Sequence, residues 1–408
     1  GTITVNIGAT LVLSSTPFLA NQTVCINEPI TNIVYTFGGS ATGATVTGLP
    51  TGVSSSISGN SVIISGTPSV LTGSPYTFNV ATTGGTCGAP TLTGTITVQP
   101  LATLALTSAP ATAAQTVCEN GAINAITYTF GGTATGATVT GLPNGVTATV
   151  TGNTVTISGS PVSAAGSPYT YTVTTTGGAC GFPSLTGIIT VNPTDTLVLT
   201  SAPATANQTV CLNATLQPIV YTFGGTVTNA TVTGLPSGVT ASVTGNTVTI
   251  SGAPSVLNAS PYTYTVSTTG QCGAPTLTGT ITVQPLATLA LTSAPATAAQ
   301  TVCENGAINA ITYTFGGTAT GATVTGLPNG VTATVTGNTV TISGSPVSAA
   351  GSPYTYTVTT TGGACGFPSL TGTITVNPTD TLVLTSAPAT ANQTVCLNAT
   401  LQPIVYTF

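Results

Sequence analysis

The chain has 408 residues, enough for roughly two to four domains of ordinary size. It contains no Lys, Arg, His, Met or Trp, and only 1% of its residues are charged, whereas 41% are apolar. This composition argues against a disordered chain. Because there is no basic patch, nucleic acid and anionic lipid are not expected as partners. No apolar run approaches the roughly 20 residues of a membrane span.

The chain is organised as repeats. Residues 1–7 read GTITVNI and match 279–285 and 372–378, which end repeats further along. We therefore expect 1–7 to be the last strand of a preceding repeat, and both ends of the chain to cut through a unit of a longer polypeptide. The predicted full repeats are 8–100, 101–193, 194–285 and 286–378, and a truncated fifth repeat starts at 379–408.

Each repeat contains a predicted β-hairpin. In residues 139–159, two runs with an apolar residue at every second position flank Gly152 and Asn153. This period is typical of strands with one buried face, and a Gly-Asn pair suits a two-residue hairpin turn. The same unit returns in the other three full repeats, each time after a Gly-Leu-Pro turn, at 51–66, 237–252 and 329–344.

The third repeat illustrates the predicted strands. We expect strands at 196–200, from Cys211 through Pro218 to Phe223, and at 230–233, 239–251 (the hairpin), 262–268 and 276–283. Tyr and Phe residues that alternate with Thr, such as Tyr128, Phe130, Tyr169 and Tyr171, are interpreted as core residues rather than as a ligand-stacking surface. About seven short strands with Gly and Pro turns, and no helical periodicity, predict an all-β protein of β-sandwich repeats.

The junctions between repeats are short. They read Val-Gln-Pro-Leu or Val-Asn-Pro-Thr, without a Gly/Ser tract or a charged spacer. A flexible linker would let domains tumble, whereas here a proline fixes one dihedral between two strands. The sequence therefore predicts a fairly stiff linear rod of repeats.

Nine cysteines recur at spacings that alternate between about 62 and about 31 residues. Without His or closely spaced Cys pairs, zinc templates do not fit, so we expect disulfides in an oxidising extracellular setting, with buried free thiols as the alternative. Pairing within a repeat would close loops of about 60 residues, worth up to ~4 kcal/mol each. The expected bonds are Cys25–Cys87, Cys118–Cys180, Cys211–Cys272 and Cys303–Cys365, with the partner of Cys396 outside the chain.

No enzyme chemistry is expected. General acid–base catalysis needs a group that titrates near pH 7 or a pair of carboxylates, and the five acids are far apart in the sequence. Ser and Thr are abundant, but no base is present to activate them. We therefore predict no catalytic residue, no bound cofactor and no metal site.

The runs GLPNGVTATVTGNTVTISGSP and SPYTYTVTTTGGACGFPSLTGTITVNP, with their copies, resemble the immunoglobulin-like repeats of very large cell-surface adhesins of Bacteroidetes. The gliding-motility adhesin of flavobacteria is the best-known relative. This resemblance implies immunoglobulin-like sandwiches, display on the bacterial outer surface and export by type IX secretion through a domain outside this chain. It also implies O-glycans on Asp-Thr-Leu triplets, which are matched here by Thr196 and Thr381.

Together these observations predict a structural and adhesive repeat region of an extracellular bacterial filament, which gives length and stiffness for attachment or gliding. Its expected partners are copies of itself and a surface or polysaccharide substratum, with no nucleic acid and no membrane insertion. Because uncharged sheet edges invite pairing, we expect them to be covered by neighbouring chains, glycans or proline-containing turns. The alternatives are a glycan-binding module and a passive stalk that presents a terminal functional domain.

Overall fold

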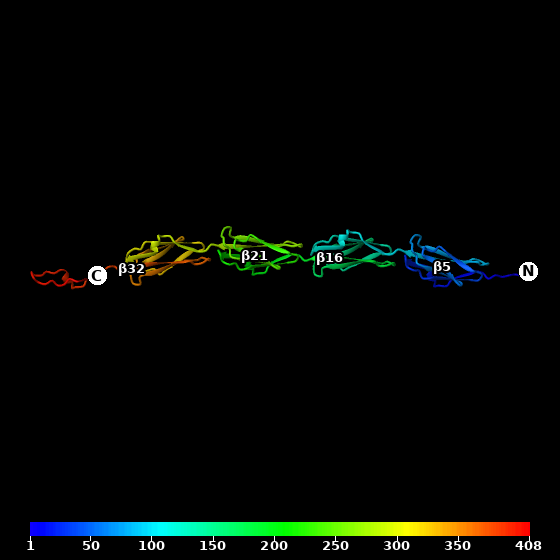
Figure 1. Ribbon diagram of the computed structural model, residues 1–408, viewed down its shortest axis with the longest axis horizontal. Helices are drawn as coiled ribbons and strands as arrows, with labels where there is room; N and C mark the ends of the chain where they lie inside the picture. Colours follow the sequence, from blue (N-terminus) through cyan, green and yellow to red (C-terminus); the bar gives the residue numbers. More distant parts are fainter. The chain divides into compact units, whose positions relative to one another are not determined.

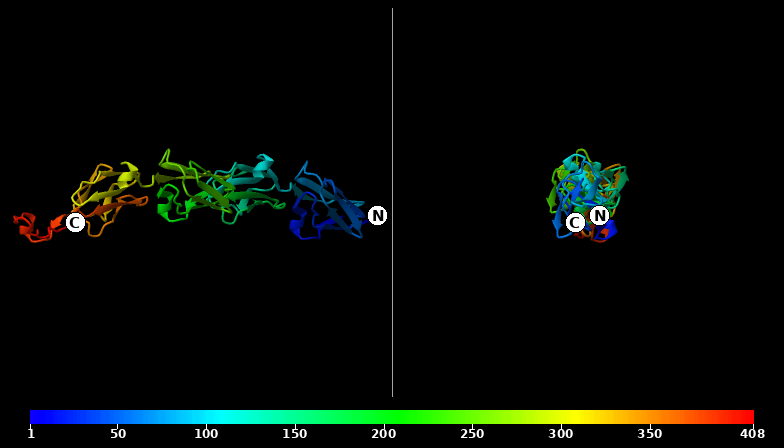
Figure 2. Two further views of the ribbon diagram at one scale, coloured as in Figure 1. Left: turned by 60° about the vertical axis from the view of Figure 1, so that its left-hand side comes forward. Right: turned by 90° about the vertical axis from the view of Figure 1, so that its right-hand side faces the viewer.

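The computed structural model describes all 408 residues, and it consists of β-strands, connecting loops and five short 3₁₀ turns, without an α-helix (Figure 1). Further views show that strands build every repeat (Figure 2). The all-β class predicted from the sequence is thus confirmed. We number the repeats 1 to 4 in chain order.

Each full repeat has eight strands and one 3₁₀ turn. Repeat 1 contains β1 (Thr10–Leu13), η1 (Pro17–Ala20), β2 (Asn21–Cys25), β3 (Ile33–Gly38), β4 (Gly43–Thr47), β5 (Val53–Ser58), β6 (Ser61–Gly66), β7 (Tyr76–Thr83) and β8 (Thr91–Gln99). Repeat 2 contains β9 (Thr103–Leu106), η2 (Pro110–Ala113), β10 (Ala114–Cys118), β11 (Ile126–Gly131), β12 (Gly136–Thr140), β13 (Val146–Thr151), β14 (Thr154–Gly159), β15 (Tyr169–Thr176) and β16 (Ser184–Asn192).

The other two full repeats follow the same plan. Repeat 3 contains β17 (Thr196–Leu199), η3 (Pro203–Ala206), β18 (Asn207–Cys211), β19 (Ile219–Gly224), β20 (Asn229–Thr233), β21 (Val239–Thr244), β22 (Thr247–Gly252), β23 (Tyr262–Thr269) and β24 (Thr276–Gln284). Repeat 4 contains β25 (Thr288–Leu291), η4 (Pro295–Ala298), β26 (Ala299–Cys303), β27 (Ile311–Gly316), β28 (Gly321–Thr325), β29 (Val331–Thr336), β30 (Thr339–Gly344), β31 (Tyr354–Thr361) and β32 (Ser369–Asn377). After it come β33 (Val383–Leu384), η5 (Pro388–Ala391) and β34 (Tyr406–Thr407).

The eight strands of a repeat form two four-stranded sheets. In repeat 2 one sheet has the order β13-β14-β11-β9 and the other the order β10-β16-β15-β12. All strand pairs are antiparallel except one, because β10 and β16 run parallel over five residue pairs, from Ala114↔Ile188 to Cys118↔Asn192. The other three full repeats have the same strand orders and the same parallel pair.

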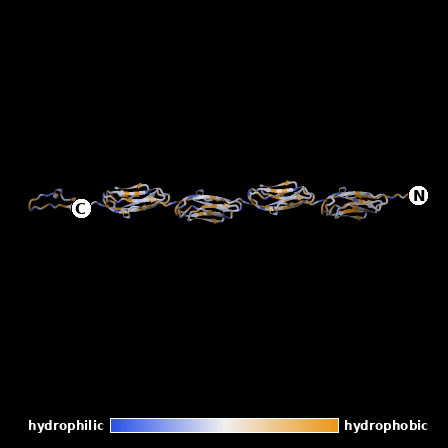
Figure 3. Ribbon diagram, turned by 90° about the horizontal axis from the view of Figure 1, so that it is seen from above, coloured by the Kyte–Doolittle hydropathy of each residue, from blue (hydrophilic) through white to orange (hydrophobic).

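The core of each repeat lies between its two sheets. In repeat 2 it includes Tyr128 and Phe130 from one sheet and Tyr171 and Ile189 from the other. Tyr128, Phe130 and Tyr171 are buried as predicted, whereas Tyr169 is half-buried and its hydroxyl group donates to the carbonyl groups of Ser163 and Ala165. Figure 3 shows apolar and near-neutral positions alternating along the strands.

One strand prediction is wrong. The sequence suggested a single strand from Cys211 to Phe223, but β18 ends at Cys211 and β19 begins at Ile219, in the other sheet. Between them Asn213 adopts a φ of 62°, a left-handed conformation that Asn tolerates and that turns the chain. The structure accordingly has eight strands in each full repeat instead of about seven.

The repeats fall into two compact units. The first comprises residues 1–195 and 270–273, and therefore holds repeats 1 and 2. The second comprises 196–269 and 274–408 and holds the sheets of repeats 3 and 4. The short segment 270–273 belongs to the first unit because it carries Cys272, which is bonded to Cys118. The sequence-based domain boundaries and the stiff rod stay predictions.

A pair of buried tyrosines joins the two sheets in repeats 2, 3 and 4. In repeat 2 the hydroxyl oxygens of Tyr128 and Tyr171 lie 3.0 Å apart. Gly187 makes room for this pair, because an added Cβ would lie 2.2 Å from the Tyr171 hydroxyl oxygen. In repeat 1 the equivalent residues are Tyr35 and Phe78, and the buried Tyr35 hydroxyl group has no hydrogen-bond partner.

We expect Phe78→Tyr to stabilise repeat 1 by about 1 kcal/mol, because the new hydroxyl group would pair with Tyr35 and reach the carbonyl group of Ala20. Hydrogen exchange of the β7 amides in the full chain measures this gain repeat by repeat. As the matched control, Tyr171→Phe should weaken the protection of β15 in repeat 2. Unchanged or lower protection of β7 in the Phe78→Tyr variant would contradict the expectation.

Candidate functional site

Three disulfides join consecutive repeats rather than closing each repeat on itself. They are Cys25–Cys180, Cys118–Cys272 and Cys211–Cys365. Each links the first cysteine of one repeat to the second cysteine of the next, across 154 or 155 residues of sequence. The predicted bonds Cys25–Cys87, Cys118–Cys180, Cys211–Cys272 and Cys303–Cys365 are therefore wrong.

The parallel strand pair explains the error. In repeat 1, Cys25 ends β2 and lies opposite Gln99 at the end of β8. Cys87 precedes β8, where its carbonyl oxygen accepts a hydrogen bond from Ala9 at the start of the repeat. The nine residues of β8 span about 30 Å, whereas disulfide-bonded Cα atoms lie roughly 4.4–6.8 Å apart. The two cysteines of one repeat thus occupy opposite ends of its sandwich.

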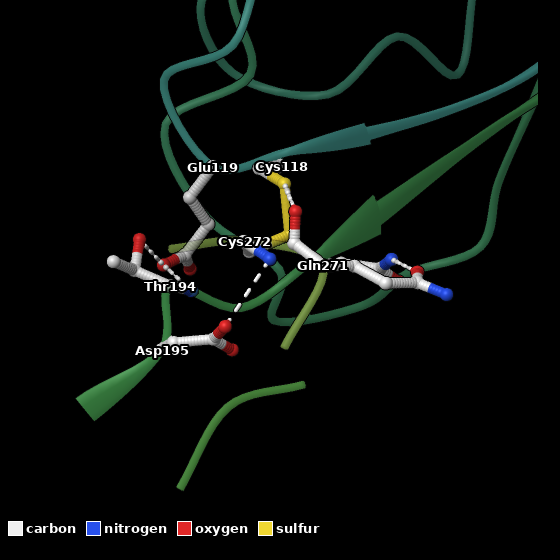
Figure 4. The surroundings of a disulfide bond; sticks show 7 residues. Cys118, Glu119, Thr194, Asp195, Gln271 and Cys272 are labelled. Carbon is white, nitrogen blue, oxygen red and sulfur yellow. Dashed lines mark hydrogen bonds between the residues drawn. A yellow bond between two sulfur atoms is a disulfide. The ribbon is translucent and has the colours of Figure 1, made fainter. Parts of the chain in front are cut away.

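Figure 4 shows the surroundings of the Cys118–Cys272 bond, where the Cα atoms are 5.5 Å apart. Cys272 is buried, with 8% of its surface exposed, and Cys118 is half-buried. The Cys118 sulfur lies 3.6 Å from the carbonyl oxygen of Gln271. The Gln271 side chain in turn accepts a hydrogen bond of 3.2 Å from the Asn192 amide group. The residue before Cys272 therefore contacts both Cys118 and the end of the last strand of repeat 2.

Glu119, directly after Cys118, holds the junction that follows repeat 2. Its carboxylate accepts a hydrogen bond of 2.7 Å from the backbone of Ala164. It also accepts hydrogen bonds of 3.2 and 3.3 Å from the backbone and the hydroxyl group of Thr194 (Figure 4). The bonds from Ala164 and then Thr194 lower the pKa of Glu119 below its ordinary value. In repeat 4, Glu304 accepts the same kind of bond from Ala349.

Asp195 acts on the other cysteine of this joint. It is buried, and its carboxylate accepts a hydrogen bond of 3.2 Å from the backbone of Cys272 (Figure 4). In repeat 2 the corresponding amide, that of Cys180, donates to the Thr133 hydroxyl group. The loop before Cys272 is one residue shorter than the loop before Cys180, and an added Cβ on Gly270 would lie 2.0 Å from the Asp195 carboxylate. Glycine at position 270 thus leaves room for the Asp195 carboxylate beside this shorter loop.

Three cysteines remain as thiols. Cys87, Cys303 and Cys396 are exposed and unpaired. Cys303 lies at the end of β26, as Cys25, Cys118 and Cys211 lie at the ends of their strands. That Cys396 pairs with a residue outside the chain stays a prediction.

The two predicted glycan positions, Thr196 and Thr381, are both exposed, and their modification stays a proposal. The structure contains no group of three or more His, Cys, Asp or Glu side chains that could hold a metal ion. None of its helical segments has the length and apolar character that would be needed to cross a membrane. The residues that lie together outside the cores are those of the joints, so the joints form the candidate site.

Sequence reasoning missed the joint residues Glu119, Thr194 and Asp195. A signal was present for the first of these, because Glu119 and Glu304 directly follow a cysteine in a chain with only five acids. Asp195 lies at a repeat junction in the sequence, and its Asp-Thr-Leu triplet suggests a glycan site at Thr196 rather than a contact with a cysteine. Its structural role depends on the shortened loop of repeat 3, which the sequence shows but does not interpret.

Comparison with solved structures identifies the fold. No protein-family model matches this sequence, and neither does any curated protein. An I-band fragment of titin is similar over 69% of this chain and 100% of its own, with 12% identity and a TM-score of 0.50. The protocadherin GammaB4 extracellular domain is similar over 92% of this chain and 68% of its own, with 13% identity and a TM-score of 0.44. The insect immune protein hemolin is similar over 90% of this chain and 100% of its own, with 13% identity and a TM-score of 0.32. The chain is a series of immunoglobulin-like β-sandwiches.

We expect disulfide mapping to find the between-repeat bonds. Peptides from a protease that cuts after aromatic residues, separated without reduction, should link Cys25 to Cys180, whereas a Cys25–Cys87 peptide would contradict the structure. As an internal control, a maleimide reagent should label Cys87 and Cys303 before reduction, because both thiols are exposed.

Acidification should loosen the contacts of Glu119. Because its pKa is lower in the folded chain, its hydrogen bonds contribute stability above the unfolded value of about 4.3, and this contribution is lost as the pH falls through the folded pKa. Exchange protection of the Ala164 and Thr194 amides should therefore drop below about pH 4. The control is Glu119→Leu, because repeat 3 has Leu212 at the equivalent position. In this variant the protection of the Ala164 and Thr194 amides should already be low at neutral pH. Protection in the wild type that does not change with pH would contradict this role.

Proposed function

We propose that the chain is a structural and adhesive repeat region of an extracellular filament. The observation that carries this proposal is the disulfide at each of three successive joints, which ties one sandwich covalently to the next. Disulfides persist in oxidising, extracellular surroundings. Because its cysteines connect consecutive repeats, the chain is suited to form a long filament whose repeats are covalently joined.

The finer assignment rests on the sequence resemblance. The repeats resemble those of large Bacteroidetes surface adhesins, which supports display on the bacterial outer surface, export by the type IX route and a role in attachment or gliding. Exposure of Thr196 and Thr381 is compatible with O-glycans at those positions. Absence of Lys and Arg leaves no site for trypsin, which suits an exposed fibre. Copies of the chain, and a surface or polysaccharide, are the proposed partners.

A second candidate function is glycan binding, and two exposed aromatic rings favour it. Phe182 and Phe367, two residues after Cys180 and Cys365, expose 62% and 61% of their surface. An exposed aromatic ring packs its face against apolar groups, and the apolar face of a sugar ring is a suitable partner. Repeats 1 and 3 have Ala89 and Ala274 at the equivalent positions and offer a natural comparison.

The proposal predicts that antibodies against the chain label intact cells that produce it, and that trypsin, which has no site here, leaves the label in place. Beads coated with the oxidised chain should adhere to a polysaccharide-coated surface more than uncoated beads do. The variant Phe182→Ala with Phe367→Ala separates the candidates, since glycan binding through these rings predicts loss of adhesion. Labelling only after the cells are lysed would contradict surface display.

A further inference from the structure

We propose that the disulfides create two covalent paths along the repeats, of which the one that includes both ends of the chain carries tension from repeat to repeat and bypasses most of each sandwich. This inference goes beyond the proposed function, because it concerns how tension passes through the chain, whatever the chain attaches to. It follows from which strands lie between consecutive cysteines.

The short segments between cysteines contain only the terminal strands of the repeats. Residues 180–211 contain β16, the last strand of repeat 2, together with β17 and β18, the first two strands of repeat 3. The long segments contain the other five strands of a repeat, as 118–180 contains β11 to β15. The alternating cysteine spacing thus separates terminal strands from internal strands.

Joined through the disulfides, the short segments form two paths. Rail 1 is residues 1–25, 180–211 and 365–408, connected by Cys25–Cys180 and Cys211–Cys365. Rail 2 is residues 87–118 and 272–303, connected by Cys118–Cys272. Each long segment is attached to the rails at both ends, and we call it a side loop although it contains five strands. The side loops are residues 25–87, 118–180, 211–272 and 303–365.

Within a repeat the two rails run side by side in the same direction. In repeat 2, β16 belongs to rail 1 and β10 to rail 2, and these two strands form the parallel pair. At one end the Ala102 amide group donates to the Cys180 carbonyl group, at 2.9 Å, and at the other end Cys118 lies opposite Asn192. Each rail therefore enters repeat 2 at one end of the sandwich and leaves at the other through covalent bonds alone.

Without the disulfides, tension would take a different route. It would enter repeat 2 at β9 and leave at the end of β16, so the sandwich would be pulled between its first and last strands. Because β10 and β16 are parallel, they would be pulled in opposite directions along their length, and only hydrogen bonds and packing would resist. With the disulfides formed, β16 is held covalently at both of its ends. The side loops then carry no tension, and the sandwich has no reason to open.

The two routes differ greatly in length. Fully extended, the reduced chain of 408 residues would measure about 1,400 Å. Rail 1 contains about a quarter of those residues, so an oxidised chain pulled by its ends reaches its covalent limit at about 350 Å. The disulfides should therefore act as a stop on extension.

Pulling the full chain by its two ends in optical tweezers tests the proposal, with Cys87, Cys303 and Cys396 replaced by Ser to prevent new bonds. The reduced chain should extend in up to four steps of about 300 Å, each releasing one repeat. The oxidised chain should show none of these steps and should stop at about a quarter of the reduced length.

Two matched variants locate the path. Cys25→Ser with Cys180→Ser interrupts rail 1, so tension must cross repeat 1 from β1 to β8. Repeat-sized steps should then appear, and the limiting length should roughly double. Cys118→Ser with Cys272→Ser removes one bond from rail 2 and leaves rail 1 intact, so its oxidised trace should match that of the unaltered chain.

After reduction both variants should show the same repeat-sized steps as the reduced parent. Because only a folded repeat gives such a step, this result verifies that the variants fold. Identical oxidised traces from the two variants, or repeat-sized steps in the oxidised parent, would overturn the proposal. Neither result would bear on surface display or adhesion, so failure of the rails is distinguishable from failure of the proposed function.

Discussion

The parallel pairing of the second and eighth strands is the interaction on which the arrangement of the joints depends. If β10 ran antiparallel to β16, Cys118 would end near the start of β16, beside Cys180 of its own repeat, and a bond within the repeat would be natural. Parallel pairing sends Cys118 to the far end of the sandwich instead. There its nearest counterpart is the cysteine that precedes the last strand of the next repeat. One ladder of five residue pairs thus decides that the disulfides connect repeats.

The few charges of the chain are concentrated where repeats meet. A carboxylate is a stronger acceptor than a neutral oxygen, and Glu119 uses this to hold the loop at Ala164 and the junction at Thr194 together. Asp195 does the same for the Cys272 amide group. Elsewhere the repeats depend on neutral contacts, such as the tyrosine pairs between their sheets. At the joint between repeats 2 and 3, carboxylates therefore hold backbone amide groups in place, whereas apolar burial stabilises the sandwiches.

The sequence predicts the strands well and their connections poorly. Alternation of apolar residues with Thr predicts β11, β15 and the β13–β14 hairpin, because a strand with one buried face has a local signature. Pairing of β10 with β16 joins residues that are more than 70 positions apart, and no local pattern reports its direction. The disulfide error follows from this gap. Cysteine spacing gives the size of a loop, but it does not say at which end of a sandwich a cysteine lies.

The internal duplication of the chain copies short segments and side loops together. Residues 87–118 and 272–303 are identical, and 180–211 and 365–396 differ only at Ile188 and Thr373. The side loops 118–180 and 303–365 are identical as well, whereas 25–87 and 211–272 differ at many positions and in length. The copied block also begins at a cysteine, since the match between the two halves starts at Cys87 and Cys272 and fails immediately before them. A block that starts there adds whole terminal-strand segments, each bounded by the cysteines that link it to its neighbours. Duplication of this block lengthens both covalent paths and repeats the cysteines through which the segments are joined.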